Sequence, residues 1–143
     1  MESTKAILTA IRNELIGSET LIAIVPAAQI ARANQQAKSV YPHISIRVEG
    51  AKGQNFSKTK TGTIYIYIYA KTVNATNGQV GDYLDDIYGI IFDLLDDRPT
   101  QLSDSNIRID NIYESFKGGA TPEDDIPTLY YIAARYNYIA HSQ

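Results

Sequence analysis

The fold of this 143-residue chain is decided by the stretch Thr63-Ile64-Tyr65-Ile66-Tyr67-Ile68-Tyr69. Three isoleucines alternate here with three tyrosines, which is the period of two that a β-strand requires and that a helix would scramble. We therefore predict a strand over residues 63–69, with the isoleucines in the core and the tyrosines facing outward. The strand propensity of tyrosine explains any single one of them. A stripe of three is unusual on a free surface, so we expect it to pack on the N-terminal helix or on a neighbouring subunit.

A second strand is predicted just upstream, over residues 43–48, where apolar and polar residues also alternate. It begins after the Tyr41-Pro42 step, because a residue that precedes proline favours extended geometry. The two strands should form an antiparallel hairpin. Residues 49–62 between them are polar and contain three glycines and three lysines. We expect a long flexible hairpin loop that becomes ordered on a partner, with plain disorder as the alternative.

These two segments supply the candidate contact residues. In the loop they are the lysines, the single aromatic side chain and the two amides before it, namely Lys52, Gln54, Asn55, Phe56, Lys58 and Lys60. On the strand they are Tyr65, Tyr67 and Tyr69, which form the candidate subunit interface because tyrosine is favoured at buried interfaces.

The clearest helix is predicted over residues 80–95, where apolar residues recur at helical spacing. They are Val80, Leu84, Ile87, Ile91, Leu94 and Leu95. Aspartates occupy the opposite side, and Pro99 prevents the helix from continuing. Because the helix and the isoleucine face of strand 63–69 each need an apolar partner, we expect the two to pack together, with Ile87, Ile91 and Leu94 at the contact.

The rest of the chain completes a simple order of elements. We predict an N-terminal helix from Ser3 or Thr4 to about residue 16, a short helical turn over 19–25 and an exposed connector over 27–39. Two more strands are predicted over 107–116 and 129–139, separated by a turn-rich segment. The expected fold is α+β: a single domain over 1–143 with a mostly antiparallel four-stranded sheet, helices packed on one face, and the order α-β-β-α-β-β.

A search for chemical motifs favours a protein without catalysis. The chain has no cysteine, two histidines and a net charge of −3, and it contains no phosphate-binding loop or nucleophile elbow. Asp82 and Asp86 would make a weak metal site. Glu123-Asp124-Asp125 is a better candidate for a divalent ion, and a small metal-dependent hydrolase is therefore kept as a minor alternative. We otherwise expect no enzyme, cofactor, metal site or membrane segment.

The pattern as a whole resembles bacteriophage tail-terminator (tail-completion) proteins. The matching features are an N-terminal helix and small apolar segment over 7–25, the strand start Tyr41-Pro42-His43-Ile44-Ser45-Ile46, and a long-tipped hairpin. An acidic amphipathic helix over 81–95 that ends in Leu-Leu and a final aromatic strand over 129–139 follow. The alternating tyrosines of strand 63–69 replace the charged residues that the family pattern has there.

The resemblance implies a structural role in virion assembly. Such proteins form a ring, generally a hexamer, that caps the tail tube, stops its polymerisation and offers an interface to the head-side connector. The implied partners are further copies of the chain, the tail tube protein and a head-completion or connector protein, with DNA passing through the ring lumen without specific binding. The implied location is the tail-neck junction of the virion, after assembly in the host cytoplasm. Another neck or head-tail connector protein is the alternative.

Overall fold

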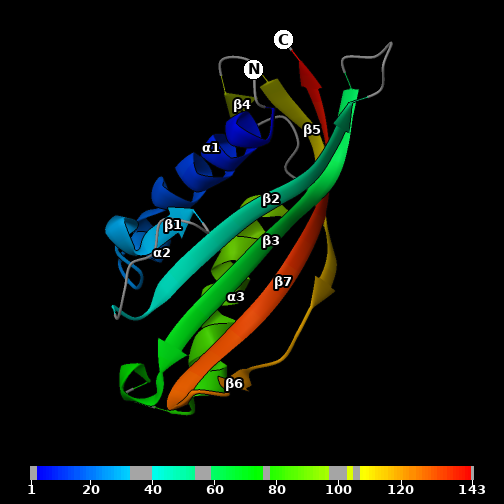
Figure 1. The fold of residues 1–143 in the computed structure, drawn as a ribbon. Coiled ribbons are helices and arrows are strands. Elements are labelled where there is room, and N and C mark those ends of the chain that lie inside the picture. Colours follow the sequence, from blue (N-terminus) through cyan, green and yellow to red (C-terminus); the bar gives the residue numbers. More distant parts are fainter. Residues whose placement is uncertain are drawn as a thin grey trace.

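The computed structural model describes residues 3–32, 40–53, 59–75, 78–96, 103–104 and 107–142. Strands dominate these residues, and three α-helices accompany them (Figure 1). In chain order the elements are α1 (Ser3–Ile16), α2 (Glu19–Ile22), η1 (Ala27–Gln29), β1 (Ile30–Arg32), β2 (His43–Gly53), β3 (Thr59–Lys71), η2 (Thr72–Asn74), α3 (Val80–Leu95), β4 (Ser103–Asp104), β5 (Ile107–Lys117), β6 (Thr121–Glu123) and β7 (Ile126–Ser142).

The strands of the described residues form one mixed sheet. Its order is β1-β2-β3-β7-β5-β4, and β6 pairs with β7 beside this path. β1 runs parallel to β2, and all the other pairs are antiparallel. The long strands β3 and β7 lie at the centre of the sheet (Figure 1).

The prediction of a mostly antiparallel four-stranded sheet with the order α-β-β-α-β-β is therefore wrong. The four long strands form, but β1, β4 and β6 add to them, and a parallel pair makes the sheet mixed. These additional strands have only two or three residues each, too few to show a period of two.

β1 shows why such a strand escapes sequence reasoning. It lies in the segment predicted to be an exposed connector, yet Ile30 is fully buried. Arg12 of α1 holds this segment in place: its Nε donates to the carbonyl of Ile30 at 2.8 Å, and its Nη2 donates to that of Ala27 at 3.3 Å. A contact between residues so far apart in sequence leaves no local pattern.

The hairpin of β2 and β3 extends further than predicted. β2 continues to Gly53 and β3 begins at Thr59, so both strands enter the segment predicted to be a loop. A bulge interrupts the pairing between Glu49 and Lys52, and Gly50 has a φ of 74° there, a conformation that favours glycine. Residues 54–58 lie outside the described residues, and the flexibility of the loop stays a prediction.

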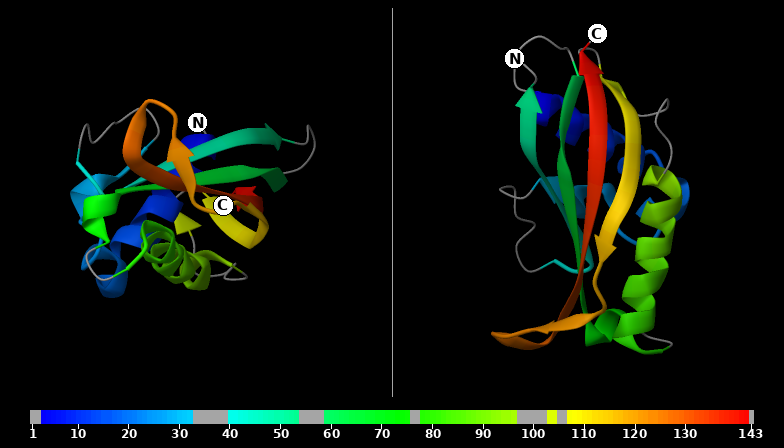
Figure 2. Two further views of the ribbon diagram at one scale, coloured as in Figure 1. Left: turned by 90° about the horizontal axis from the view of Figure 1, so that it is seen from below. Right: turned by 90° about the vertical axis from the view of Figure 1, so that its right-hand side faces the viewer.

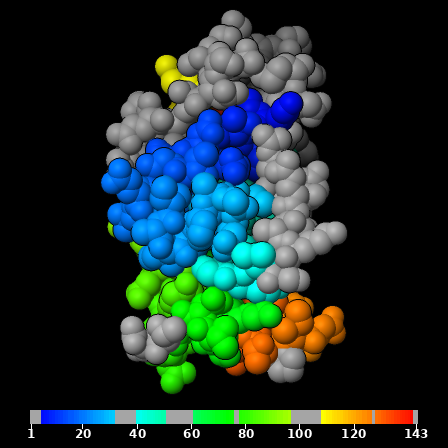
Figure 3. All heavy atoms as spheres, turned by 90° about the vertical axis from the view of Figure 1, so that its left-hand side faces the viewer, coloured from blue at the N-terminus to red at the C-terminus, as the bar shows by residue number. Residues whose placement is uncertain are grey.

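Both long helices cover the same face of the sheet (Figure 2). The isoleucines of β3 are fully buried in one apolar cluster with residues of α1 and α3, among them Ile87 and Ile91. This confirms the predicted packing, except that Leu94 is only partly buried and Leu95 takes the inner position. On the side of α1 and α2, these helices and the segment after them form one continuous surface (Figure 3). No helix among the described residues is long and apolar enough to cross a membrane.

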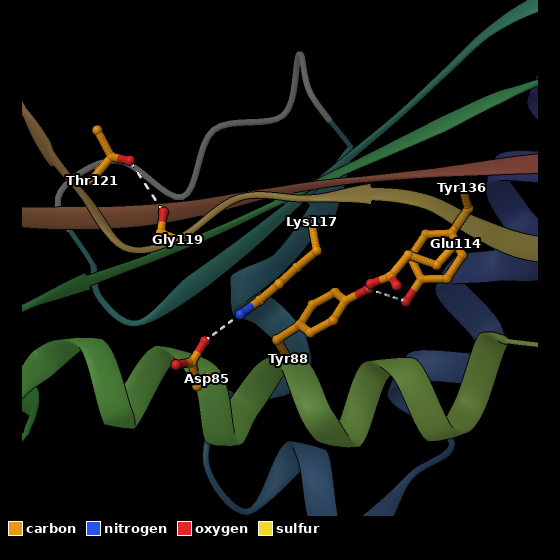
Figure 4. A network of polar contacts seen from close by, with 7 residues as sticks. All are labelled: Asp85, Tyr88, Glu114, Lys117, Gly119, Thr121 and Tyr136. Atoms are coloured by element: carbon orange, nitrogen blue, oxygen red, sulfur yellow. Dashed lines mark hydrogen bonds and ion pairs between the residues drawn. The ribbon is translucent and has the colours of Figure 1, made fainter.

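A polar network joins α3 to β5 and β7 (Figure 4). The Tyr88 hydroxyl donates to the Glu114 carboxylate and lies 2.7 Å from the Tyr136 hydroxyl. Lys117 pairs with Asp85 at 2.6 Å. Burial and the hydrogen bond to Glu114 raise the pKa of Tyr88 well above its ordinary value, so this hydroxyl remains a donor. The network sets the position of α3 along the sheet.

Candidate interaction surface

The face of the sheet opposite the helices is uncovered by other described elements along most of its length, and we call it the open face (Figure 2). Side chains alternate along each strand, so the neighbours of the buried isoleucines point to this side. The strand register aligns them in rows across β2, β3, β7 and β5. The main members are His43, Arg47, Glu49, Tyr65, Tyr67, Tyr69, Tyr131, Arg135, Tyr113 and Phe116.

Aromatic rings cluster at one end of the open face. The His43 ring lies 5.0 Å from that of Tyr41 and 4.7 Å from that of Tyr69. Tyr69 also lies 5.8 Å from Tyr131 across the β3–β7 pair and 6.4 Å from Tyr67 along its own strand. These centroid distances are those of favourable offset and tilted ring pairs. The cluster therefore gives the open face a firm apolar platform.

Burial favours the neutral forms of the ionisable side chains in this ring cluster. It lowers the pKa of His43, against a smaller raising effect of the contact with the Val40 carbonyl. It also raises the pKa of Tyr69. Both shifts disfavour a charge within the cluster at neutral pH.

The centre of the open face carries two arginines in different surroundings. The Arg47 guanidinium lies 4.3 Å from the ring centroid of Tyr65 and pairs with Glu49 at 2.5 Å. Arg135 lies 5.5 Å from the ring centroid of Phe116, and it has no carboxylate partner among the described residues. One arginine is therefore neutralised locally, and the other presents a charge that a partner can meet.

Two large aromatic side chains of β5 protrude on the open face, Phe116 opposite Arg135 and Tyr113 opposite Asn137. Phe116 is 51% exposed and Tyr113 is 44% exposed, although both belong to a strand whose inner face is buried. Aromatic and arginine side chains are enriched among the residues that dominate binding energy at protein interfaces. The open face thus has the composition of a protein-binding surface.

The structure places the predicted contact residues in three groups. Tyr65, Tyr67 and Tyr69 lie on the open face, as the alternation predicted. The N-terminal helix α1 packs on the other face, so it is not the element that covers these tyrosines. Lys52 and Lys60 belong to the paired ends of β2 and β3. The remaining loop residues, Gln54, Asn55, Phe56 and Lys58, lie outside the described residues.

Sequence reasoning missed Arg47, Tyr113, Phe116 and Arg135 as members of this surface. The outward direction of Arg47 and Arg135 follows from strand parity, but the proximity of all four residues depends on the pairing of β2 with β3 and of β5 with β7. Bulges in β5 also change the parity partway along that strand. The arginine and aromatic content of the predicted strands could have indicated these residues, but the register between the strands could not be read from the sequence.

The acidic candidates do not come together as a metal centre. The described residues contain no group of three or more histidine and carboxylate side chains that could hold an ion. Asp82 and Asp86 lie exposed on α3, while Glu123, Asp124 and Asp125 lie at the turn between β6 and β7.

Comparisons with known proteins give a match in structure and none in sequence. The sequence matches no protein-family profile and no curated protein sequence. The chain is similar to one from the virion of a native gene transfer agent (GTA) particle, with a TM-score of 0.71, 11% identity and 99% of both chains covered. It is also matched to the bacteriophage SPP1 gp17 protein, with a TM-score of 0.47, 13% identity and coverage of 94% of this chain and 89% of that one.

The first match shows a shared fold over the whole length, and the second is too distant to support an argument. A sequence identity near one residue in nine carries no information on individual site residues. The protein thus has the fold of a chain found in a virion, which agrees with the resemblance to tail terminators seen in its sequence.

Proposed function

We propose that this protein is a structural component of a phage-type tail that acts as a tail terminator. It forms a ring, a hexamer by the family resemblance, that caps the tail tube and stops its polymerisation. The observation that carries the proposal is the fold shared with a GTA virion chain over 99% of both chains.

The open face supports an assembly role. Its ring cluster, its protruding Phe116 and the guanidinium of Arg135 form a surface suited to another protein. A closed ring of identical subunits needs two different surfaces on each copy, because each copy meets its neighbours head to tail. The partners in this proposal are further copies, the tail tube protein and a head-completion or connector protein, and the location is the tail-neck junction.

In this role the protein acts by covering the end of the tube and catalyses no chemical step. Once the ring covers the growing end of the tube, the surface that it presents differs from that of a tube subunit, so no further tube subunit can add. DNA passes through the lumen without specific binding, and the opposite side of the ring receives the head-side connector.

The test is to image particles made in the absence of this protein. Electron microscopy of a deletion mutant should show filled heads and separate tails of uncontrolled length, and expression of the protein in trans should restore joined particles. Separate tails of normal length would instead indicate a head-tail connector. Joined particles with tails of normal length would contradict both roles.

A further inference from the structure

We infer that the open face of one copy docks on the outer side of helix α3 of the next copy, so that these two surfaces close the ring. The inference rests on the proposed ring and names the surfaces that meet in it. The evidence for it is the charge and the shape of these two surfaces, the open face and the outer side of α3.

The outer side of α3 is acidic and exposed. Positions 82, 86, 89 and 93 recur at helical spacing opposite the buried stripe of this helix, and they form what we call the outer stripe: Asp82, Asp86, Gly89 and Asp93. Asp85 beside it pairs with Lys117 at 2.6 Å. Asp82 and Asp86 have no cation partner among the described residues. They are therefore available to a cation from another molecule.

The open face supplies the complementary charge. Arg135 at its centre has no carboxylate partner in the described part of the chain, Arg47 lies nearby on Tyr65, and Lys71 lies 5.1 Å from the ring centroid of Tyr41 at its aromatic end. Glu49 already pairs with Arg47. Burial and the nearby Glu123 carboxylate raise the pKa of Tyr69, so the aromatic end is of mixed charge and the cationic part of the open face is its centre, around Arg135 and Arg47. Cations on one side and carboxylates on the other favour contact between successive copies and disfavour contact between identical faces.

The shapes of the two surfaces also fit. A shallow hollow beside α3 is lined by Asp86, Gly89 and Asp93 on the outer stripe and also by the paired Asp85 and Lys117, and a Cβ atom added at Gly89 would meet nothing within 4 Å. Glycine in an exposed helix interior is less favourable than alanine, and it lets another molecule approach the helix backbone closely. Phe116 and Tyr113 protrude from the open face and can enter such a hollow.

Other ways of joining two copies are less suited to this chain. The long strands beside the short edge strands, β2 and β5, both carry bulges, and bulges interrupt the ladder that an added strand would need. Single-stranded nucleic acid could stack on the open face. The neutral ring cluster, the pairing of Arg47 with Glu49 and the net charge of −3 favour a protein partner.

Because the helices and the open face lie on opposite sides of the sheet, the contact is heterologous (Figure 2). Each copy offers its open face to one neighbour and its α3 side to the other. The rotation between copies then determines whether the chain of contacts closes.

The decisive experiment uses two complementary charge-reversal variants. Variant A carries Arg47→Glu and Arg135→Glu, and variant B carries Asp82→Lys and Asp86→Lys. Within each variant alone, the two docking surfaces have like charges, so we expect the dissociation constant for self-association to rise about a hundredfold, measured by sedimentation or native mass spectrometry. An equimolar mixture restores opposite charges at every contact, so assemblies should re-form with A and B in alternation.

A matched control and thermal unfolding separate docking from folding. Lys5→Glu with Glu19→Lys reverses two exposed charges on α1 and α2 and should leave assembly unchanged. All variants should unfold at the wild-type temperature within a few degrees. Gly89→Ala gives a second readout of opposite sign, because it should stabilise the isolated subunit while weakening assembly about tenfold by filling the hollow.

Each other outcome overturns the inference. If the wild-type protein forms rings and neither variant disturbs them, or if mixing fails to restore assembly, the surfaces that meet are different ones and the proposed ring stands. A wild-type protein that stays monomeric overturns self-docking, while tail length in the deletion mutant still decides the proposed function. Binding of a labelled single-stranded oligonucleotide that variant A loses and variant B keeps, without restoration of assembly on mixing, would identify a nucleic-acid surface instead.

Discussion

On β3, isoleucines that face the helices are fully buried, whereas the tyrosines between them remain partly exposed on the open face. Both rows share one backbone and one set of strand partners. The inner row is needed to fold the subunit, because burial of apolar area is the dominant favourable term. The outer row adds ring contacts within the subunit and keeps much of its surface for a partner. Stability and assembly can therefore be changed separately, by substituting adjacent residues of β3.

The largest loss of stability is expected from a substitution in the inner row. Ile66→Ala should lower the free energy of unfolding by about 2–5 kcal/mol, because it leaves a cavity under both helices. The adjacent substitution Tyr67→Glu, like Tyr65→Glu, should leave the subunit folded and weaken self-association. Chemical denaturation at concentrations where the protein is monomeric measures the first effect, and sedimentation measures the second. Equal loss of stability at positions 66 and 67 would remove the distinction between the two faces.

Gly62→Ala tests how tightly the inner row is packed at the hairpin. A Cβ atom there would lie 2.6 Å from the Tyr138 hydroxyl oxygen and 2.7 Å from the Glu49 carbonyl oxygen. We expect a loss of about 1–3 kcal/mol, measured by thermal or chemical denaturation, because the Glu49 backbone cannot move aside without disturbing the bulge. Adding Tyr138→Phe should recover only part of this loss. A Gly62→Ala protein as stable as the wild type would show that the hairpin relaxes freely.

Two buried tyrosines of β7, on the same inner face of the sheet, differ in their hydrogen bonding. The Tyr136 hydroxyl lies 2.7 Å from that of Tyr88, whereas the Tyr138 hydroxyl is buried without a hydrogen-bond partner among the described residues. Tyr136→Phe should therefore cost about 1 kcal/mol of unfolding free energy, while Tyr138→Phe should be neutral or stabilising. Urea denaturation of the two variants side by side would reveal a reversed order.

The same hydroxyl gives a pH dependence. Burial raises the pKa of Tyr138 from 10.0 to about 12. The stability that this neutral tyrosine contributes is fully present below pH 10 and is lost as the pH rises toward 12, because the unfolded chain loses its proton first. Unfolding free energy measured across this range should fall, and less steeply in Tyr138→Phe. Some fall should remain, because burial also raises the pKa values of Tyr88 and Tyr136. Identical slopes in both proteins would contradict the assignment.

The smallest effect on stability is expected at the hairpin tip. Replacing residues 54–59 by Asn-Gly would join Gly53 to Lys60, which are already paired, through a two-residue turn. Stability should change little, since closure entropy depends weakly on loop length. We propose that the tip contacts the tail tube or the adjacent subunit, so tail completion should nevertheless fail. Normal tails from the shortened protein, seen by electron microscopy, would make the tip a simple connection.

Periodicity made the long elements predictable. β2, β3 and α3 occur where alternation or helical spacing placed them, because five or more residues suffice to distinguish a period of 2 from one of 3.6, and β5 and β7 occupy the other two segments predicted as strands. The outward direction of Tyr65, Tyr67 and Tyr69 followed from the same alternation. The additional strands β1, β4 and β6 were not predictable in this way, since each is too short to show a period.

The sequence by itself therefore determined which residues of β3 and of α3 lie inside and which lie outside. Only the tertiary structure decided which outward residues become neighbours, because register and bulges are set by pairing between distant segments. This is why Arg47 of β2 lies on Tyr65 of β3, and why Arg135 of β7 lies beside Phe116 of β5.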